Sequence, residues 1–421
     1  MDATTPEARA LAHRGFKRFW AGQGLAQLGF QFGGLATAVI AVDLLHATDA
    51  QMGYLNAANT AAFLLVGLIA GAWVDRWRKR RVMIVADLAR VLLMLAAPLL
   101  WFADALTFWH LMVIGALLGL ATVFFDVAYQ SYIPVLVGRE AIADANGKLE
   151  STSQIARLGG PAVAGLLLKF VSAPVLLLIN AVGFAVSAVT LLAIRDDEQP
   201  ADRANRRPLV TEIREGLSFV LRPPFLQRLL ANTCTTNFGA TIVFTLQSIL
   251  VLRILGLDPS LLGVIMSIGA VGGLVASLTQ ARFTRKFGDG PVILMSTTTA
   301  AIGIFLVPLS ATIPRAAVAL LIAAAFIQSF AVIVFNITQV SARQRLCPPH
   351  LLGRMNASIR FVVWGIMPIS ALTAGALGTA IGTVPAIWVG VALMFIGIAP
   401  FLGRYGRMRT LPTSPEGTLG A

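Results

Sequence analysis

The 421-residue sequence has few charged side chains, few histidines and only two cysteines. Charged residues make up 13% of the chain, which does not suit a polar surface around a globular core. Cys234 lies in an apolar stretch and Cys347 in a basic connection, so no disulfide framework is predicted. The histidines are scattered over separate segments, at His13, His46, His110 and His350. This spacing does not favour a metal site.

Catalytic and nucleotide-binding patterns are absent from the sequence as well. We find no nucleophile triad, no metal-ligand cluster and no glycine loop that would cradle a phosphate. The sequence therefore predicts neither an enzyme nor a bound cofactor or metal. Any energy-requiring task would have to draw on an ion gradient, since there is no nucleotide-binding domain.

Long apolar stretches are what the chain has instead. The mean hydropathy is +0.78, and 57% of the residues are hydrophobic. About 20 apolar residues in a helix cross the ~30 Å hydrocarbon core of a bilayer. Twelve stretches of roughly this length predict an all-α membrane protein. They cover about residues 18–45, 52–74, 82–103, 107–131, 153–173, 175–194, 227–253, 260–281, 290–312, 315–340, 355–380 and 384–403.

The basic residues are sorted by side. The net charge is +13, yet Lys169, Arg253 and Arg315 alone fall on the outer side of the predicted spans, and Arg90 lies inside the third span. The other lysines and arginines lie in the termini, the even-numbered connections or the helix ends beside them. Basic loops mark the cytoplasmic face. We therefore expect both termini to be cytoplasmic, and the charge to report a lipid bilayer rather than a nucleic acid as partner.

The chain divides into two halves that repeat. A polar connection predicts an N-terminal six-helix bundle at 1–194, a central cytoplasmic loop at 195–226 and a C-terminal bundle with a cytoplasmic tail at 227–421. Parallel repeats of this kind place a substrate site between the halves, which open alternately to each side. The matched pairs share an offset of 210 residues: Gly53 with Gly263, Phe125 with Phe335, Asn146 with Asn356, Gly165 with Gly375, Gln27 with Asn237, and Asp126 with Asn336.

A charged loop follows the second stretch. Gly71 is followed four residues later by Asp75 and Arg76, and then by the basic residues Arg80 and Arg81. This loop resembles the signature motif of the major facilitator superfamily. The resemblance covers the whole chain and implies the major facilitator fold, with twelve transmembrane helices in two pseudo-symmetric six-helix bundles. It also implies a monomeric, secondary active transporter of the cytoplasmic (inner) membrane.

The resemblance gives the loop a gating role. In the family, the aspartate at the position of Asp75 helps to close the cytoplasmic side by contacting a helix end in the other half. Two departures stand out: Arg78 replaces a usual glycine, and Arg285 and Lys286 occupy the second-half positions of Asp75 and Arg76. We therefore carry the gating role over to the first half alone. Orientation by the positive-inside rule is the simpler role of the basic turn.

A finer resemblance points to exporters. Residues 133–139 and 352–356, together with Gly160, Pro161 and Gly165, resemble the bacterial branch that includes the enterobactin exporter and macrolide-efflux proteins. Small residues allow close helix packing and proline bends a helix, so plain packing explains the Gly-Pro-Gly motif as well as an exporter-specific role does.

Charges inside spans are costly and are candidate functional residues. Asp87 and Arg90 lie three residues apart and so share a helix face. With Asp126 they are expected to form a charge network beside the signature loop. We favour a structural gating role for Asp126 over direct proton carriage. Proton coupling is thus an expectation from the family resemblance.

Uncharged polar residues are the candidates for the cavity, with helix-to-helix hydrogen bonding as the alternative role. They are Gln23, Gln27, Asn56, Asn59, Asn237, Gln328 and Asn336. A neutral cavity suits a bulky amphipathic ligand. Asp43 and Arg253 occupy equivalent outer helix ends, and we expect them to pair as an outer gate.

These patterns predict export of an amphipathic small molecule, of drug or siderophore type, by alternating access and proton antiport. Uptake of a nutrient or metabolite is the alternative within transport. A non-transporting scaffold or receptor is a less favoured alternative, because it needs neither the signature loop nor the internal repeat.

Overall fold

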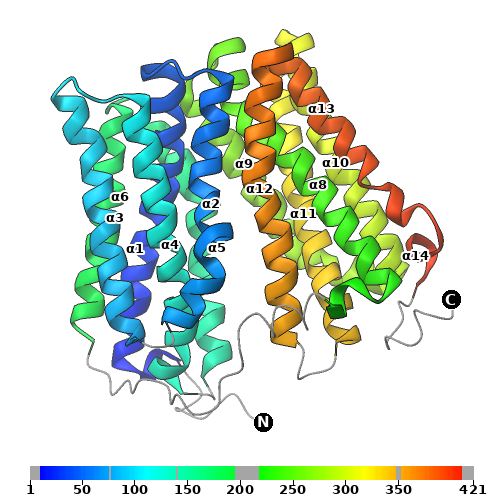
Figure 1. Ribbon diagram of the computed structural model, residues 1–421, viewed down its shortest axis with the longest axis horizontal. Coiled ribbons are helices and arrows are strands. Elements are labelled where there is room, and N and C mark those ends of the chain that lie inside the picture. Colours follow the sequence, from blue (N-terminus) through cyan, green and yellow to red (C-terminus); the bar gives the residue numbers. More distant parts are fainter. Residues whose placement is uncertain (1–9, 75–76, 139–140, 195–217, 348–351, 410–421) are drawn as a thin grey trace. The chain divides into compact units, whose positions relative to one another are not determined.

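The computed structural model describes residues 10–74, 77–138, 141–194, 218–347 and 352–409. In these ranges the chain is helical and contains no strand. Twelve long helices occur in the described residues (Figure 1). They are α1 (Arg14–Val39), α2 (Asp49–Val74), α3 (Lys79–Phe102), α4 (Phe108–Val137), α5 (Ile142–Leu167), α6 (Ala173–Leu192), α8 (Pro224–Ser248), α9 (Pro259–Phe287), α10 (Asp289–Thr312), α11 (Ala317–Leu346), α12 (Leu352–Ile381) and α13 (Thr383–Ile396).

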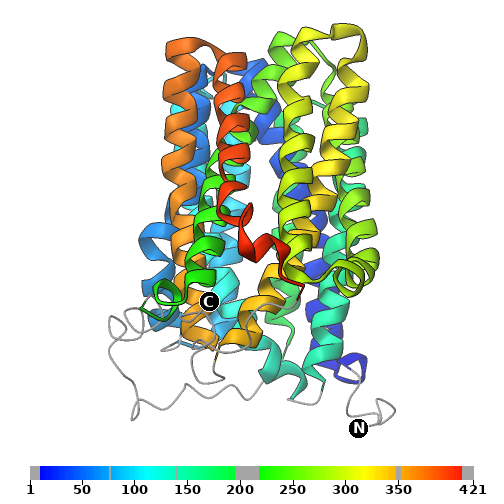
Figure 2. The ribbon, with the colours of Figure 1, turned by 90° about the vertical axis from the view of Figure 1, so that its right-hand side faces the viewer.

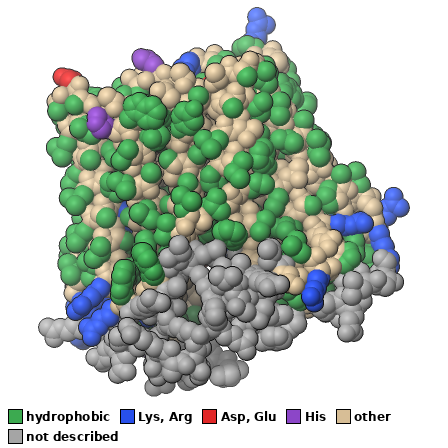
Figure 3. Space-filling model, in the orientation of Figure 1, with side chains coloured by type: hydrophobic (Ala, Val, Ile, Leu, Met, Phe, Trp, Pro, Cys, Tyr) green, Lys and Arg blue, Asp and Glu red, His purple; other side chains and the backbone are tan. Residues whose placement is uncertain are grey.

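The described helices have the length and composition of membrane spans. Ten of the helices in the described ranges are long and apolar enough to cross a bilayer. The face seen in Figure 3 is covered mainly by apolar side chains, and most of its charged side chains lie toward its ends. Apolar surface of this extent is stable in lipid rather than in water. The chain is therefore a multi-pass membrane protein, as predicted.

Several helices extend beyond the apolar stretches that predicted them. The largest difference is α5, which begins at Ile142 rather than near residue 153. Its added first turns are polar and are supported by an ion pair between Lys148 and Asp144, one turn apart. A hydropathy pattern reports the part of a helix that lies in lipid, so it misses polar turns that continue the same helix into water.

Contacts divide the chain into two compact units. Unit 1 comprises Met1–Ala47, Ala58–Asn205 and Asp258–Ser267; unit 2 comprises Thr48–Ala57, Arg206–Leu257 and Ile268–Ala421. Each unit thus contains most of one predicted half together with the first ten residues or so of a helix from the other half, namely the start of α2 or of α9. The predicted central loop lies largely outside the described residues, since 195–217 are not described.

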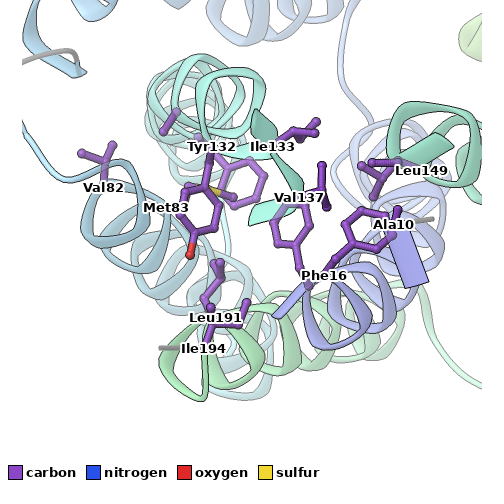
Figure 4. Close-up of a cluster of buried hydrophobic side chains, with 14 of the residues drawn as sticks. Ala10, Phe16, Val82, Met83, Tyr132, Ile133, Val137, Leu149, Leu191 and Ile194 are labelled. Atoms are coloured by element: carbon purple, nitrogen blue, oxygen red, sulfur yellow. The ribbon is translucent and has the colours of Figure 1, made fainter. Parts of the chain in front are cut away.

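An aromatic and aliphatic cluster forms the core of unit 1 at the end where the chain enters α1. Phe16, Met83 and Tyr132 from three helices are fully buried there (Figure 4). Leu191 closes the same cluster from α6. Burying side chains of this size stabilises a fold by about 1.5–3 kcal/mol each in water, and the cluster fixes how α1, α3, α4 and α6 pack.

Unit 2 has a corresponding cluster at the end where α8 begins. The ring of Phe225 on α8 packs against Phe401 and Tyr405, with ring centroids 6.2 and 5.7 Å away. Phe401 belongs to η7 (Ala399–Phe401) and Tyr405 to α14 (Arg404–Arg407), through which the chain leaves α13 (Figure 2). The end of the last helix is thereby held against the start of α8.

The 210-residue repeat is present in the backbone as well as in the sequence. Five of the six helix pairs begin 210 residues apart, from Arg14 and Pro224 for α1 and α8 onward. Both of these helices end in a π-helical turn, η3 (Ile40–Leu44) and η4 (Ile249–Ile254). The next residues with positive φ are His46 (48°) and Gly256 (60°), again 210 apart. An isolated π-turn is rare, so its repetition identifies a duplicated structure.

Candidate functional site

Unit 2 contains a pocket that brings three predicted cavity residues together. Asn237 on α8, Gln328 and Asn336 on α11 all line it. The cavity measures about 80 Å³, which suits one chemical group rather than a whole drug-sized molecule. Its other lining residues are small, aromatic or aliphatic: Thr236, Ala240, Thr297, Ala300, Val332, Phe335 and Met394. None of the lining residues that the structure describes carries a charge.

Beside the N–H donors of its three amides, the pocket lining carries hydrogen-bond acceptors that other groups leave available. Gln328 is 7% exposed, and its Oε1 has no hydrogen-bond partner among the described residues. The hydroxyls of Thr236 and Thr297 donate to the carbonyls of Asn232 and Ile293, both at 2.8 Å. Each hydroxyl has thus used its single proton, and its oxygen can still accept.

Unit 1 fills the equivalent place with a charged side chain. Subtracting 210 from Thr297, Ala300 and Phe335 gives Asp87, Arg90 and Phe125. The Arg90 guanidinium lies 3.9 Å from the ring centroid of Phe125 and 4.4 Å from that of Phe184. Met394 of the unit 2 pocket lies at the offset position of Phe184.

Arg90 is held by carboxylates as well as by aromatic rings. It forms an ion pair with Asp87, whose side chain is fully buried, and is itself 5% exposed. Asp126 on α4 is exposed and attracts Arg90 electrostatically. The structure thus brings the three predicted network residues together. A buried cation is tolerated when paired and stacked on aromatic faces, and both conditions are met here.

Two polar residues of α6 were not among the predicted site residues. Ser187 on α6 interacts with Asp87, and its Oγ accepts a hydrogen bond of 2.8 Å from the Gln23 amide. Asn180, about two turns before Ser187 in α6, donates to the sulfur of Met94 at 3.3 Å. Gln23 therefore forms an interhelical hydrogen bond, the alternative role considered for it. A single asparagine in an apolar span is the signal that would have found Asn180.

The other predicted cavity residues lie apart from this pocket. Asn56 donates to the carbonyl of Met52 at 3.0 Å and belongs to unit 2. Gln27 and Asn59 are half-buried in unit 1. A backbone carbonyl of Asn59 approaches α4 closely, since a Cβ placed on Gly119 would lie 2.6 Å from it.

The signature loop is only partly described. Gly71 lies in α2, whereas Asp75 and Arg76 lie outside the described residues. Arg80 donates to the carbonyl of Leu192 at 3.5 Å, and Arg81 is exposed. The gating role therefore stays a prediction.

The position of the missing family glycine differs between the halves. Arg78 precedes α3 with φ −68°, in extended backbone. Its second-half equivalent, Gly288, precedes α10 with φ 89°, a conformation that favours glycine. At this position the first-half turn therefore has extended backbone where the second-half turn is left-handed.

Glycines form two equivalent helix contacts. In unit 1, a Cβ on Gly165 of α5 would lie 2.9 Å from the carbonyl oxygen of Ser260 on α9. The α9 residue Ser267 also accepts a 2.9 Å hydrogen bond from the backbone N–H of Ala162, next to Pro161. The third motif residue, Gly160, packs on Gln31 of α1.

In unit 2, a Cβ on Gly53 of α2 would lie 2.7 Å from the carbonyl of Ala371 and 2.9 Å from the Cα of Gly375 on α12. Asp49 at the start of α2 also accepts hydrogen bonds from the Thr383 hydroxyl at 2.9 and 3.0 Å. The glycines that the repeat pairs in sequence are therefore those at which helices touch.

Asp43 and Arg253 lie in the two π-helical turns and are both exposed. They belong to different units. Their pairing as an outer gate stays a prediction.

The sequence profile of the Major Facilitator Superfamily matches residues 19–372. The chain is 26% identical over 391 residues to the uncharacterised MFS-type transporter YfiS of Bacillus subtilis (strain 168), covering 91% of this chain and 89% of that protein. It is 25% identical over 358 residues to the multidrug efflux pump Tap of Mycolicibacterium fortuitum, covering 80% and 85%. Similarity to macrolide efflux protein A of Streptococcus pyogenes is 22% over 374 residues, covering 87% and 90%.

Solved transporters share the fold. The nucleoside transporter NupG, as its D323A mutant, superposes with a TM-score of 0.75 at 14% identity, covering 92% of this chain and 99% of that one. A bacterial homologue of the iron transporter ferroportin superposes with a TM-score of 0.70 at 16% identity, covering 94% and 99%. At these identities the likeness establishes the twelve-helix architecture alone.

Proposed function

Because the chain belongs to the major facilitator superfamily, we propose that it exports amphipathic small molecules, of drug or siderophore type, in exchange for protons. It is a membrane transporter of small molecules and not an enzyme. The proposed location is the cytoplasmic (inner) membrane, with both termini in the cytoplasm and a monomer as the working unit. The one-sided distribution of basic residues supports that orientation.

The uncharged pocket of unit 2 carries the export proposal. A small organic anion would require a buried lysine or arginine, and the described pocket lining has neither. Phe335 and Met394 offer a polarizable wall, and amides offer a few hydrogen bonds, which is the usual make-up of sites for amphipathic ligands. The full-length similarity to efflux proteins agrees with this chemistry.

Alternating access is supported by the two glycine contacts. Each joins the start of one helix to a helix from the other half of the chain through small residues, so little side-chain packing has to be broken when they separate. A contact made in one state only can bias a two-state equilibrium.

Asp126 is the carboxylate best placed to respond to protons. It is exposed while Asp87 is fully buried against Arg90. Protonating Asp126 would remove one of the two negative charges facing Arg90 and change the electrostatics of unit 1. Replacing Asp126→Asn should flatten the pH profile of transport if this acid carries protons. An unchanged profile with a lower rate would assign it a structural gating role.

Accumulation of ethidium and of a macrolide in an efflux-deficient bacterial host tests the function. Export predicts lower accumulation in cells that make the protein, and loss of the difference when a protonophore collapses the gradient. Higher accumulation would indicate uptake instead. A protonophore-insensitive difference would contradict proton exchange.

A further inference from the structure

The unit 2 pocket corresponds to a place in unit 1 that the side chain of Arg90 fills. In unit 1 the guanidinium of Arg90, a planar group with several N–H donors, packs on the rings of Phe125 and Phe184. Phe335 and Met394 stand at the two equivalent positions in unit 2, and Ala300 replaces the arginine. The duplicated scaffold therefore leaves a space of similar lining where no side chain enters.

The charges around the two places differ. Asp87 and Asp126 face Arg90, whereas Thr297 and Asn336 occupy their positions in unit 2. A cation bound among neutral groups at this depth would lack a counter-charge, which is costly. The pocket is thus suited to a planar group that is not charged.

The hydrogen-bond acceptors of the pocket indicate that the ligand carries a donor. Gln328 offers a buried Oε1 that has no partner among the described residues, and the oxygens of Thr236 and Thr297 retain free lone pairs. An unpaired buried acceptor costs about 1–3 kcal/mol until a donor reaches it. A ligand N–H would satisfy it.

We propose that this pocket binds an uncharged, planar N–H donor group of the substrate, such as a carboxamide, a urea or an aromatic amine. The group stacks against Phe335, donates to Gln328 Oε1, and is selected over groups without N–H. This proposal specifies the chemistry of the exported substrate. It rests on the proposed export function, because only in a transporter would this pocket be a substrate site.

Three probes of similar shape test the proposal: benzamide, methyl benzoate, which lacks N–H, and the cation benzamidine. Binding to the full chain in lipid nanodiscs is measured by ligand-observed saturation-transfer NMR. We expect benzamide to bind at least fivefold more tightly than either of the other probes. Equal binding of benzamide and methyl benzoate would overturn the donor requirement, and tighter binding of benzamidine would overturn the neutral preference.

Two variants locate the binding. Gln328→Met removes the acceptor at similar size, and Ala300→Leu fills the pocket without adding polarity; each should weaken benzamide at least tenfold. Gln154→Met on α5, where the amide contacts Glu150 at 2.6 Å, is the matched control and should change nothing. If Gln328→Met fails to fold, Ala300→Leu decides the case. Unchanged benzamide binding in the folded pocket variants would refute the assignment.

The two proposals fail separately in these experiments. Dye efflux without benzamide binding refutes the pocket assignment alone. Benzamide binding without efflux refutes export alone.

Discussion

Equivalent positions in the two units carry different side chains and form different structures. In unit 1 Arg90 packs on two aromatic rings and pairs with Asp87, whereas in unit 2 the equivalent positions line a neutral pocket of about 80 Å³. The backbones correspond down to a π-helical turn, so the difference lies in side chains. In unit 1 the Arg90 side chain, paired with Asp87 of the same helix, packs on rings of α4 and α6 and occupies the space itself. In unit 2 small neutral residues leave room for a ligand. The proposal thus assigns stabilisation to one half of a duplicated scaffold and ligand binding to the other.

Breaking the ion pair should have the largest effect. Asp87→Thr or Arg90→Ala alone leaves one buried charge without its partner, and we expect a loss of about 3–5 kcal/mol in the free energy of unfolding. The double variant installs both second-half residues and should lose much less. Denaturant unfolding in detergent, monitored by tryptophan fluorescence, gives the three values. A double variant as unstable as the sum of the single ones would contradict the pairing.

Filling a glycine contact should come next. Gly165→Ala and Gly375→Ala each place a Cβ about 3 Å or less from backbone atoms of the facing helix. Overpacking of this kind costs about 1–3 kcal/mol, so thermal stability and transport rate should both fall. Gly159→Ala on α5 meets nothing within 4 Å and serves as the control. Equal behaviour of the three variants would show that the glycines are not packing positions.

A charge placed in the lining of the pocket should change which ligand it prefers. Asn336→Asp copies the carboxylate that unit 1 carries at Asp126. Because Asn336 is exposed, we expect little loss of stability and a reversal in which benzamidine binds more tightly than benzamide. The same NMR measurement applies. No change in the ratio of the two affinities would place the pocket beyond the influence of residue 336.

We expect the smallest difference between the two halves at the starts of α2 and α9. Thr48 precedes α2 and exchanges hydrogen bonds with Gln51, while Asp258 precedes α9 and accepts from the backbone N–H of Ser260 at 2.8 Å. Hydrogen bonds from Ser260 lower the pKa of Asp258, so its contribution is present at neutral pH and disappears as the pH falls through that lowered value.

Thr48→Ala and Asp258→Ala should each cost about 1 kcal/mol or less in the free energy of unfolding. Urea or thermal unfolding at pH 7 measures both. A loss as large as that of the ion-pair variants would mean that these residues do more than cap a helix.

The sequence predicted the twelve helices and the offset of the repeat because both depend on apolar length and residue identity. It also named Asn237, Gln328 and Asn336, since uncharged polar residues stand out in apolar spans. It missed the threonines of the pocket, because a hydroxyl bonded to its own helix is common in any span. That α2 and α12, and α5 and α9, touch at these glycines depends on how the helices cross, which one sequence does not encode locally.

The most direct test installs the unit 1 arrangement in unit 2. The double variant Thr297→Asp with Ala300→Arg should fill the pocket with its own ion pair and remain folded. Ethidium accumulation, with and without a protonophore, is compared for wild type, this variant and empty vector in an efflux-deficient host. We predict protonophore-sensitive efflux by wild type and none by the variant. Efflux by the folded variant at the wild-type rate would show that the pocket takes no part in transport.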